Sequence, residues 1–179
     1  GFKDFSYASG NYAGNTEADT TKRVFPFDLA WSPDSKHFAV MRWDMRPVKD
    51  FWVINSLSSP RPTLETYKYQ MPGEPGPLGH LYVFDAKDWS SHQVKINAFK
   101  DQDLSLQTAP ETVKETFNEF NNYTWLGDNS GFYLNRLSRD LKRMDICYVG
   151  IGSESTKTVL SERMNTYVES RPLRIIDNG

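Results

Sequence analysis

Two stretches of the chain share one order of residues, and this recurrence restricts the possible folds more than any other feature. "LAWSPDSKHFAVMR" begins at residue 29, and "YTWLGDNSGFYLNR" begins at residue 123. One residue of slip later, "DFWVI" from Asp50 aligns with "DICYV" from Asp145. The first alignment pairs Trp31 with Trp125, Asp34 with Asp128, Phe38 with Phe132, Val40 with Leu134, and Arg42 with Arg136.

A tryptophan, a turn, an aromatic strand and an apolar strand therefore recur in one order, which predicts a repeat architecture. A propeller blade is a small sheet of four strands that must be covered by its neighbours, so its strands are apolar on both faces. "HFAVM" fits this pattern, with Phe38 and Val40 on one face and Ala39 and Met41 on the other. The alternative is a chance likeness between two aromatic hairpins of a β-sandwich.

Composition agrees with an all-β fold. Aromatic residues make up 14% of the 179 residues, and aromatic side chains favour strands. We expect a polar loop segment over residues 1–23 and a partial β-propeller of about two to three blades over residues 24–179. Residues 56–80 contain five prolines and predict a long proline-rich loop. At most one short helix is expected, at residues 108–120, where Thr108 and Glu111 resemble a capping box.

Several classes of function are disfavoured. Lys and Arg number 21 against 23 Asp and Glu, so a basic surface for nucleic acid is not expected. Cys147 is the single cysteine and should be a small buried hydrophobic residue. The three histidines lack metal-ligand spacing, so we expect neither a metal nor another cofactor. The sequence contains no apolar run long enough to span a membrane.

Four segments together resemble a known family: "WSPDSKHFAV", "DFWVINSLSSPRPTLETYKYQMPGE", "LYVFD" and "LSRDLKRMDICYV". They look like the N-terminal β-propeller of dipeptidyl peptidase IV-like serine peptidases, in the prolyl oligopeptidase family, with Bacteroides-type members the nearest in appearance. The resemblance covers about residues 24–176. It implies a larger enzyme in which an α/β-hydrolase domain carries the catalytic Ser, Asp and His, and a periplasmic or secreted location.

No catalytic residue is predicted in this chain. The family's nucleophile lies on a G-x-S-x-G elbow, and the nearest run here, Gly150 to Ser153, lacks the second glycine. The resemblance also implies a pair of glutamates that hold the substrate's free amine, before the Trp-Ser-Pro segment. The family spacing falls instead on Thr20 and Thr21, which leaves Glu17 as the candidate substrate-binding residue. The competing interpretation, which we favour, is that Glu17 is an exposed loop carboxylate.

We therefore expect the non-catalytic propeller portion of a serine exopeptidase that releases N-terminal dipeptides. The propeller would limit access to short peptides and contribute to their binding, while the peptide bond is cleaved in the hydrolase domain. The alternative is a binding or scaffold propeller of the WD-like or TolB-like kind with no peptidase domain. Exposed blade edges predict self-association, and "SRDLKR" at residues 138–143 is expected to be a solvated charged loop.

Overall fold

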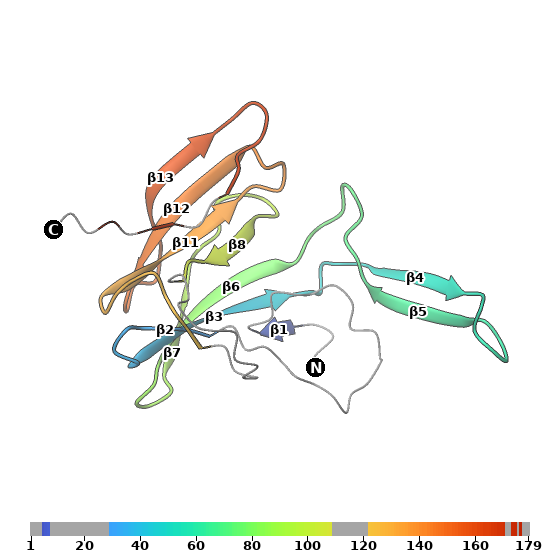
Figure 1. Cartoon of the computed structure of the whole chain (residues 1–179), viewed down its shortest axis with the longest axis horizontal. Coiled ribbons are helices and arrows are strands. Elements are labelled where there is room, and N and C mark those ends of the chain that lie inside the picture. The colour runs from blue at the N-terminus through green and yellow to red at the C-terminus, as the bar shows by residue number, and fades with distance from the viewer. Residues whose placement is uncertain (1–4, 8–28, 109–121, 171–172, 175, 177–179) are drawn as a thin grey trace.

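The computed structural model describes residues 5–7, 29–108, 122–170, 173–174 and 176, and none of these is helical. Apart from Thr108, the predicted helix at residues 108–120 cannot be assessed, because residues 109–121 lie outside the described part of the chain. The boundary predicted between residues 23 and 24 lies outside it as well. The described elements form two larger, mainly antiparallel sheets and a separate hairpin (Figure 1).

The first sheet carries the first copy of the repeat. Its strand order is β7-β6-β3-β2-β9, and β1 also pairs with β3. β9 runs parallel to β2, while the other pairs are antiparallel. The strands are β1 (Phe5–Tyr7), β2 (Leu29–Trp31), β3 (His37–Asp44), β6 (Leu78–Asp85), β7 (Ser91–Val94) and β9 (Asn122–Thr124).

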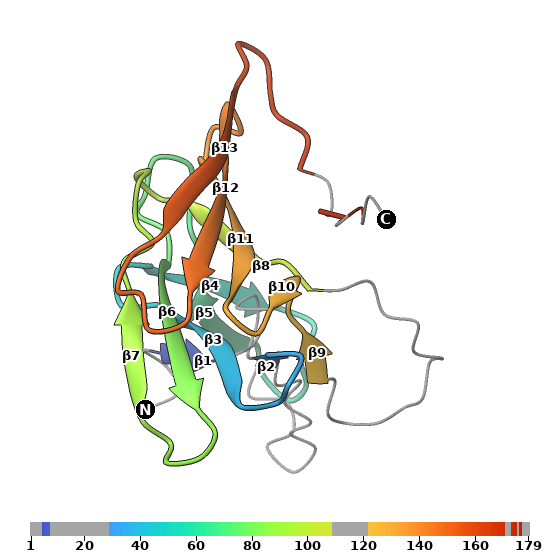
Figure 2. The same ribbon diagram turned by 90° about the vertical axis from the view of Figure 1, so that its left-hand side faces the viewer.

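The second sheet carries most of the second copy of the repeat, whose first residues lie in β9 of the first sheet. Its strand order is β10-β11-β12-β13, and β8 pairs with β11 beyond the end of β10. Figure 2 shows this sheet next to the first, with β13 at its outer edge. The strands are β8 (Asp103–Leu106), β10 (Gly127–Asp128), β11 (Gly131–Leu137), β12 (Arg143–Gly150) and β13 (Lys157–Arg163).

The predicted proline-rich loop is partly wrong, because residues Thr63–Lys68 form strand β5. It pairs in register with β4 (Asp50–Asn55), from Asp50 opposite Lys68 to Asn55 opposite Thr63. We call this two-stranded hairpin the arm, and Figure 1 shows it projecting away from both sheets. Thr63, Thr66 and Tyr67 of β5 are residues that favour a strand, but the flanking prolines obscured this signal.

The arm also corrects part of the proposed repeat. "DFWVI" lies in the arm, whereas "DICYV" lies in β12, next to β11 within the second sheet. The strand that pairs with β3 in the corresponding way is β6, which contains "LYVFD". The arm is therefore an insertion between two neighbouring strands of the first sheet. The sequence alignment failed here because the two segments look alike, each with an Asp followed by apolar residues.

The main core lies between the two sheets. Ala39 and Met41 of β3 belong to one buried cluster together with Phe132 and Leu134 of β11. Phe38 and Val40, on the opposite face of β3, belong to a second cluster with Trp31 and Phe84. The prediction that β3 is apolar on both faces is thus confirmed. A sheet of this kind needs a covering layer on each side, which is the packing requirement of a blade.

The turn that precedes β3 has a built-in scaffold of side-chain hydrogen bonds. Ser32 Oγ donates to Asp34 Oδ1 over 2.8 Å, the Lys36 amide donates to the same carboxylate, and the His37 amide donates to Ser32 Oγ. These bonds lower the pKa of Asp34, with the Ser32 hydroxyl the largest cause. Ser and Asp are favoured in turns because their short polar side chains can accept hydrogen bonds from nearby backbone amides.

The same scaffold occurs a second time, between β11 and β12. Ser138 Oγ donates to Asp140 Oδ1 over 2.6 Å, and the Lys142 and Arg143 amides donate to Asp140 and Ser138 respectively. The residue after the aspartate has φ of +57° in both turns, at Ser35 and Leu141. We call this arrangement the S-x-D-x-K turn. It defines a recurrence that the alignment of the two tryptophan segments did not reveal.

Main-chain and side-chain hydrogen bonds join the two sheets directly. The Trp125 amide donates to the Trp31 carbonyl over 2.9 Å, so the two aligned tryptophans are neighbours. The Asp34 amide donates to Asn129 Oδ1 over 3.1 Å, which connects the turn of the first copy to that of the second. At another point the Lys95 amide donates to the Glu154 carbonyl. The sheets are therefore fixed to each other by polar contacts as well as by the shared core.

The shared core predicts a large difference between two truncations. Phe132 is fully buried between the sheets and stacks on Trp125, with ring centroids 4.7 Å apart. Phe132→Ala should lower the free energy of unfolding by about 3–5 kcal/mol, because it leaves a cavity there. Leu57→Ala, at a side chain 93% exposed, should change it by less than about 0.5 kcal/mol. Urea unfolding followed by tryptophan fluorescence measures both. Equal losses would contradict the assigned core.

Candidate functional site

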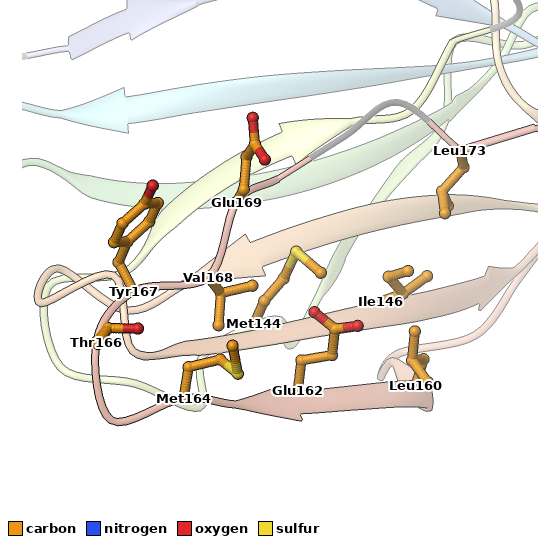
Figure 3. Close-up of a pocket in the computed structure, with 10 residues that line it drawn as sticks. All are labelled: Met144, Ile146, Leu160, Glu162, Met164, Thr166, Tyr167, Val168, Glu169 and Leu173. Atoms are coloured by element: carbon orange, nitrogen blue, oxygen red, sulfur yellow. The ribbon is translucent and has the colours of Figure 1, made fainter.

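A shallow groove lies on the face of the second sheet that points away from the first. Its floor is formed by β12 and β13, and one wall is formed by the segment that follows β13 (Figure 3). The floor residues are Met144, Ile146, Leu160 and Glu162, and the wall residues are Met164, Thr166, Tyr167, Val168, Glu169 and Leu173. The groove is thus mainly apolar, with one carboxylate on its floor and one on its wall.

The sheet beneath the groove contains a buried polar group with an unused acceptor. Asn135 lies opposite Ile146 in the β11–β12 ladder and is 4% exposed. Its Nδ2 donates to Ser170 Oγ over 3.4 Å, and its Oδ1 has no hydrogen-bond partner among the described residues.

A buried charge network lies on the opposite face of the same sheet. Asp145 accepts hydrogen bonds from Arg136 Nε over 2.9 Å, Arg163 Nη1 over 3.0 Å and Ser161 Oγ over 2.7 Å. Both guanidinium groups lie near the ring of Phe99, at 5.6 and 5.4 Å from its centroid. Asp145 already pairs with both guanidinium groups. The arrangement therefore favours a structural role for these three residues over ligand binding.

This network controls the ionisation of Asp145. Burial by itself raises the pKa of the carboxyl group, but the hydrogen bonds from Ser161, Arg163 and Arg136 outweigh burial, so its pKa lies below the ordinary value. Burial also raises the pKa of the Cys147 thiol, which agrees with the predicted role of Cys147 as a small buried hydrophobic residue.

The described residues do not assemble a nucleophilic catalytic set. Within them, no serine, threonine or cysteine side chain is hydrogen-bonded to a histidine ring; His80 Nδ1 contacts Gln93 Nε2, and His37 Nε2 lies 3.7 Å from Asp85. Ser153 lies in the turn between β12 and β13, where its amide donates to the Gly150 carbonyl. A strand–turn–strand setting differs from the strand–turn–helix of a nucleophile elbow.

Two further classes of site find no support in the part of the chain that the structure describes. No group of three or more His, Cys, Asp or Glu side chains there is arranged to hold a metal ion. The described segments also include no helix of the length and apolarity that a membrane crossing requires.

Glu17, the predicted substrate-binding residue, lies outside the described residues, so its role stays a prediction. "SRDLKR" is not merely a solvated loop, since Arg139 donates hydrogen bonds to the Glu74 and Met71 carbonyls at the base of the arm. The sequence signal that could have revealed this turn is the shared spacing of Ser, Asp and Lys in "SPDSK" and "SRDLK". The groove was also missed, because its wall comes from a segment without regular periodicity.

Comparison with known proteins places the fold. The family described as "Dipeptidyl peptidase IV (DPP IV) N-terminal region" matches residues 27–175. The chain therefore belongs to this family. Its two stacked sheets are a partial β-propeller, in agreement with the predicted fold class.

Two solved structures are similar to the chain. Dipeptidyl peptidase 4 of Porphyromonas gingivalis has a TM-score of 0.65 at 17% sequence identity, over 92% of this chain and 20% of that one. A putative dipeptidyl aminopeptidase IV from Bacteroides ovatus ATCC 8483 has a TM-score of 0.57 at 18% identity, over 79% of this chain and 18% of that one. The chain thus spans about a fifth of these proteins. No curated protein matches it.

The Asp145 network predicts a pH-dependent loss of stability. Asp145→Asn removes the charge that both arginines contact and should cost about 3–5 kcal/mol near pH 7. The carboxylate's contribution is fully present above its unfolded pKa of about 4 and is lost as the pH falls through its lower folded pKa. The difference between variant and parent should therefore shrink in acid.

Urea unfolding between pH 7 and pH 2.5 measures this difference. Asp88→Asn provides a matched control, because Asp88 is an exposed turn residue whose carboxylate accepts a hydrogen bond from the Ser90 amide. The structural role assigned to Asp145 is contradicted if Asp145→Asn lowers the free energy of unfolding at pH 7 by no more than Asp88→Asn does.

Proposed function

We propose that the chain is the non-catalytic propeller portion of a dipeptidyl peptidase IV-like serine exopeptidase. The observation that carries the proposal is the family match across residues 27–175. In the whole protein the peptide bond would be cleaved by a serine nucleophile of an α/β-hydrolase domain.

In this proposal the propeller limits access to the active site and contributes to substrate binding. The faces of stacked blades are buried against each other, so the turns at the ends of the blades are the parts that can contact substrate. Glu17 is the candidate for a carboxylate that pairs with the free amine of a peptide, and the alternative that we favour is an exposed loop carboxylate. We also propose a periplasmic or secreted location, on the strength of the family resemblance.

The peptidase assignment predicts activity in the full-length gene product and none in this chain alone. The assay is hydrolysis of chromogenic Xaa-Pro and Xaa-Ala dipeptide substrates by each protein at equal concentration. A full-length variant with its elbow serine replaced by alanine is the control for contaminating peptidases. Activity in the isolated chain would contradict the proposal. Inactivity of both proteins would favour the binding-propeller alternative.

A second prediction concerns self-association through the blade edges. Among the described strands, β13 is an edge strand of seven exposed residues, and an unpaired edge can add a strand from another copy. We expect the chain to dimerise in light scattering as its concentration rises. Val159→Lys, in the middle of β13, should weaken the dimer at least about tenfold, because a charge on an edge opposes strand pairing. A strictly monomeric profile at all concentrations would contradict this prediction.

A further inference from the structure

The arm is attached to the second sheet, although it is inserted in the first. A turn from Met71 to Glu74 leads from β5 back towards β6, and the Glu74 amide closes this turn on the Met71 carbonyl over 3.0 Å. Arg139, in the turn between β11 and β12, donates to both carbonyls at this point. Its Nη1 contacts the Glu74 carbonyl and its Nη2 contacts the Met71 carbonyl over 3.2 Å.

Arg139 is held in place from its own side. It occupies the second position of the S-x-D-x-K turn, whose Ser138 and Asp140 side chains fix the backbone. Its guanidinium also lies 3.5 Å from Asp101 Oδ2, in the loop between β7 and β8. That loop is organised by the buried Gln102, whose Oε1 accepts hydrogen bonds from the Ala98 and Phe99 amides.

One end of the arm is anchored by packing, because Met45 and Val48, just before β4, are buried in the main core. Two polar contacts also lie at the base of the arm. The Tyr69 amide donates to the Lys49 carbonyl over 3.1 Å, and Lys49 Nζ contacts Glu74 Oε1 over 2.8 Å. Both contacts join the two ends of the arm to each other, so they do not fix its direction. Most of β4 and β5 is exposed, and an isolated two-stranded hairpin is only marginally stable in water.

The chemistry of arginine suits this position. A guanidinium presents a rigid fork of donors that can contact two carbonyls at once, whereas a lysine ammonium is a point charge on a flexible stem. The corresponding position of the first S-x-D-x-K turn is Pro33, which has no donor to offer. The second turn therefore has the same backbone scaffold with an added contact group.

We infer that Arg139 is a positioning residue that couples the arm to the second sheet, so that the two move as one body. The S-x-D-x-K turn holds the backbone of Arg139 in place, and the Arg139 side chain binds the two carbonyls of the Met71–Glu74 turn. The second sheet then holds the arm at its β5 end, in addition to the burial of Val48 before β4, and a contact made by the arm is transmitted to the second sheet.

Arg139→Pro is the most informative variant, because Pro33 shows that the S-x-D-x-K turn accepts proline at this position. Amide hydrogen exchange of the 179-residue chain, read at Tyr69 and Glu74, should be at least about tenfold faster in this variant. Arg139→Lys should give an intermediate increase. The matched control is Arg143→Met, which removes an exposed arginine at the end of the same turn.

A second measurement separates altered orientation from local loosening. Spin labels at Ser58→Cys in the arm and Lys157→Cys in β13, in a Cys147→Ser background, report the distance between arm and second sheet. The distance distribution should be narrow in the parent and clearly broader in Arg139→Pro, while core amides such as that of Val149 remain protected.

The inference is overturned if the distance distribution is as narrow in Arg139→Pro as in the parent, or if Arg143→Met accelerates exchange at Glu74 equally. If the core amides of Arg139→Pro lose their protection from exchange, Arg139→Lys becomes the deciding variant. In that case the inference is overturned if Arg139→Lys has the same exchange rates at Tyr69 and Glu74, and the same distance distribution, as the parent.

Discussion

The structure depends on the burial of one sheet face against the next. Ala39 and Met41 from β3 meet Phe132 and Leu134 from β11 in one core, and neither sheet could bury these side chains alone. The opposite face of β3 is apolar too, through Phe38 and Val40. Each sheet is therefore built to be covered on both sides, and this requirement explains why the chain repeats one pattern of strands.

The polar contacts follow from this stacking. Once the cores meet, the turns of the two copies come close enough for the Asp34 amide to reach Asn129, and for the Trp125 amide to reach the Trp31 carbonyl. The buried Arg136–Asp145 pair lies within the second sheet, where Asp145 also accepts hydrogen bonds from Ser161 and Arg163. Charges buried with complete hydrogen bonding can be tolerated where isolated ones cannot.

Much of this fold could be predicted from the sequence, and the exceptions have physical causes. The two-sided apolar pattern of β3 holds, because it reflects burial, which the sequence records directly. The alignment of the two tryptophan segments holds only in part, since Trp31 lies opposite Phe38 whereas Gly127 lies opposite Phe132. The pairing of "DFWVI" with "DICYV" is wrong, because strand composition does not reveal which neighbour a strand pairs with. β5 was missed because prolines at both flanks suggested a loop.

The candidate site was harder to predict. The role of Arg139 depends on two segments that lie far apart in the sequence and meet only after the sheets have stacked. The groove beside β13 depends on the path of an irregular segment after Arg163. Glu17 stays a prediction that rests on the family resemblance. Long-range contacts of this kind leave no local signal, in contrast to the Ser, Asp and Lys spacing of the S-x-D-x-K turn.

The most direct test of the account is an experimental structure of the full-length gene product at side-chain resolution. The account predicts that the sheets built on β3 and β11 are adjacent blades of one ring, with further blades covering Phe38 on one side and the groove beside β13 on the other, and with an α/β-hydrolase domain facing the ring. A closed two-layer sandwich, with no further blades against these faces, would contradict it.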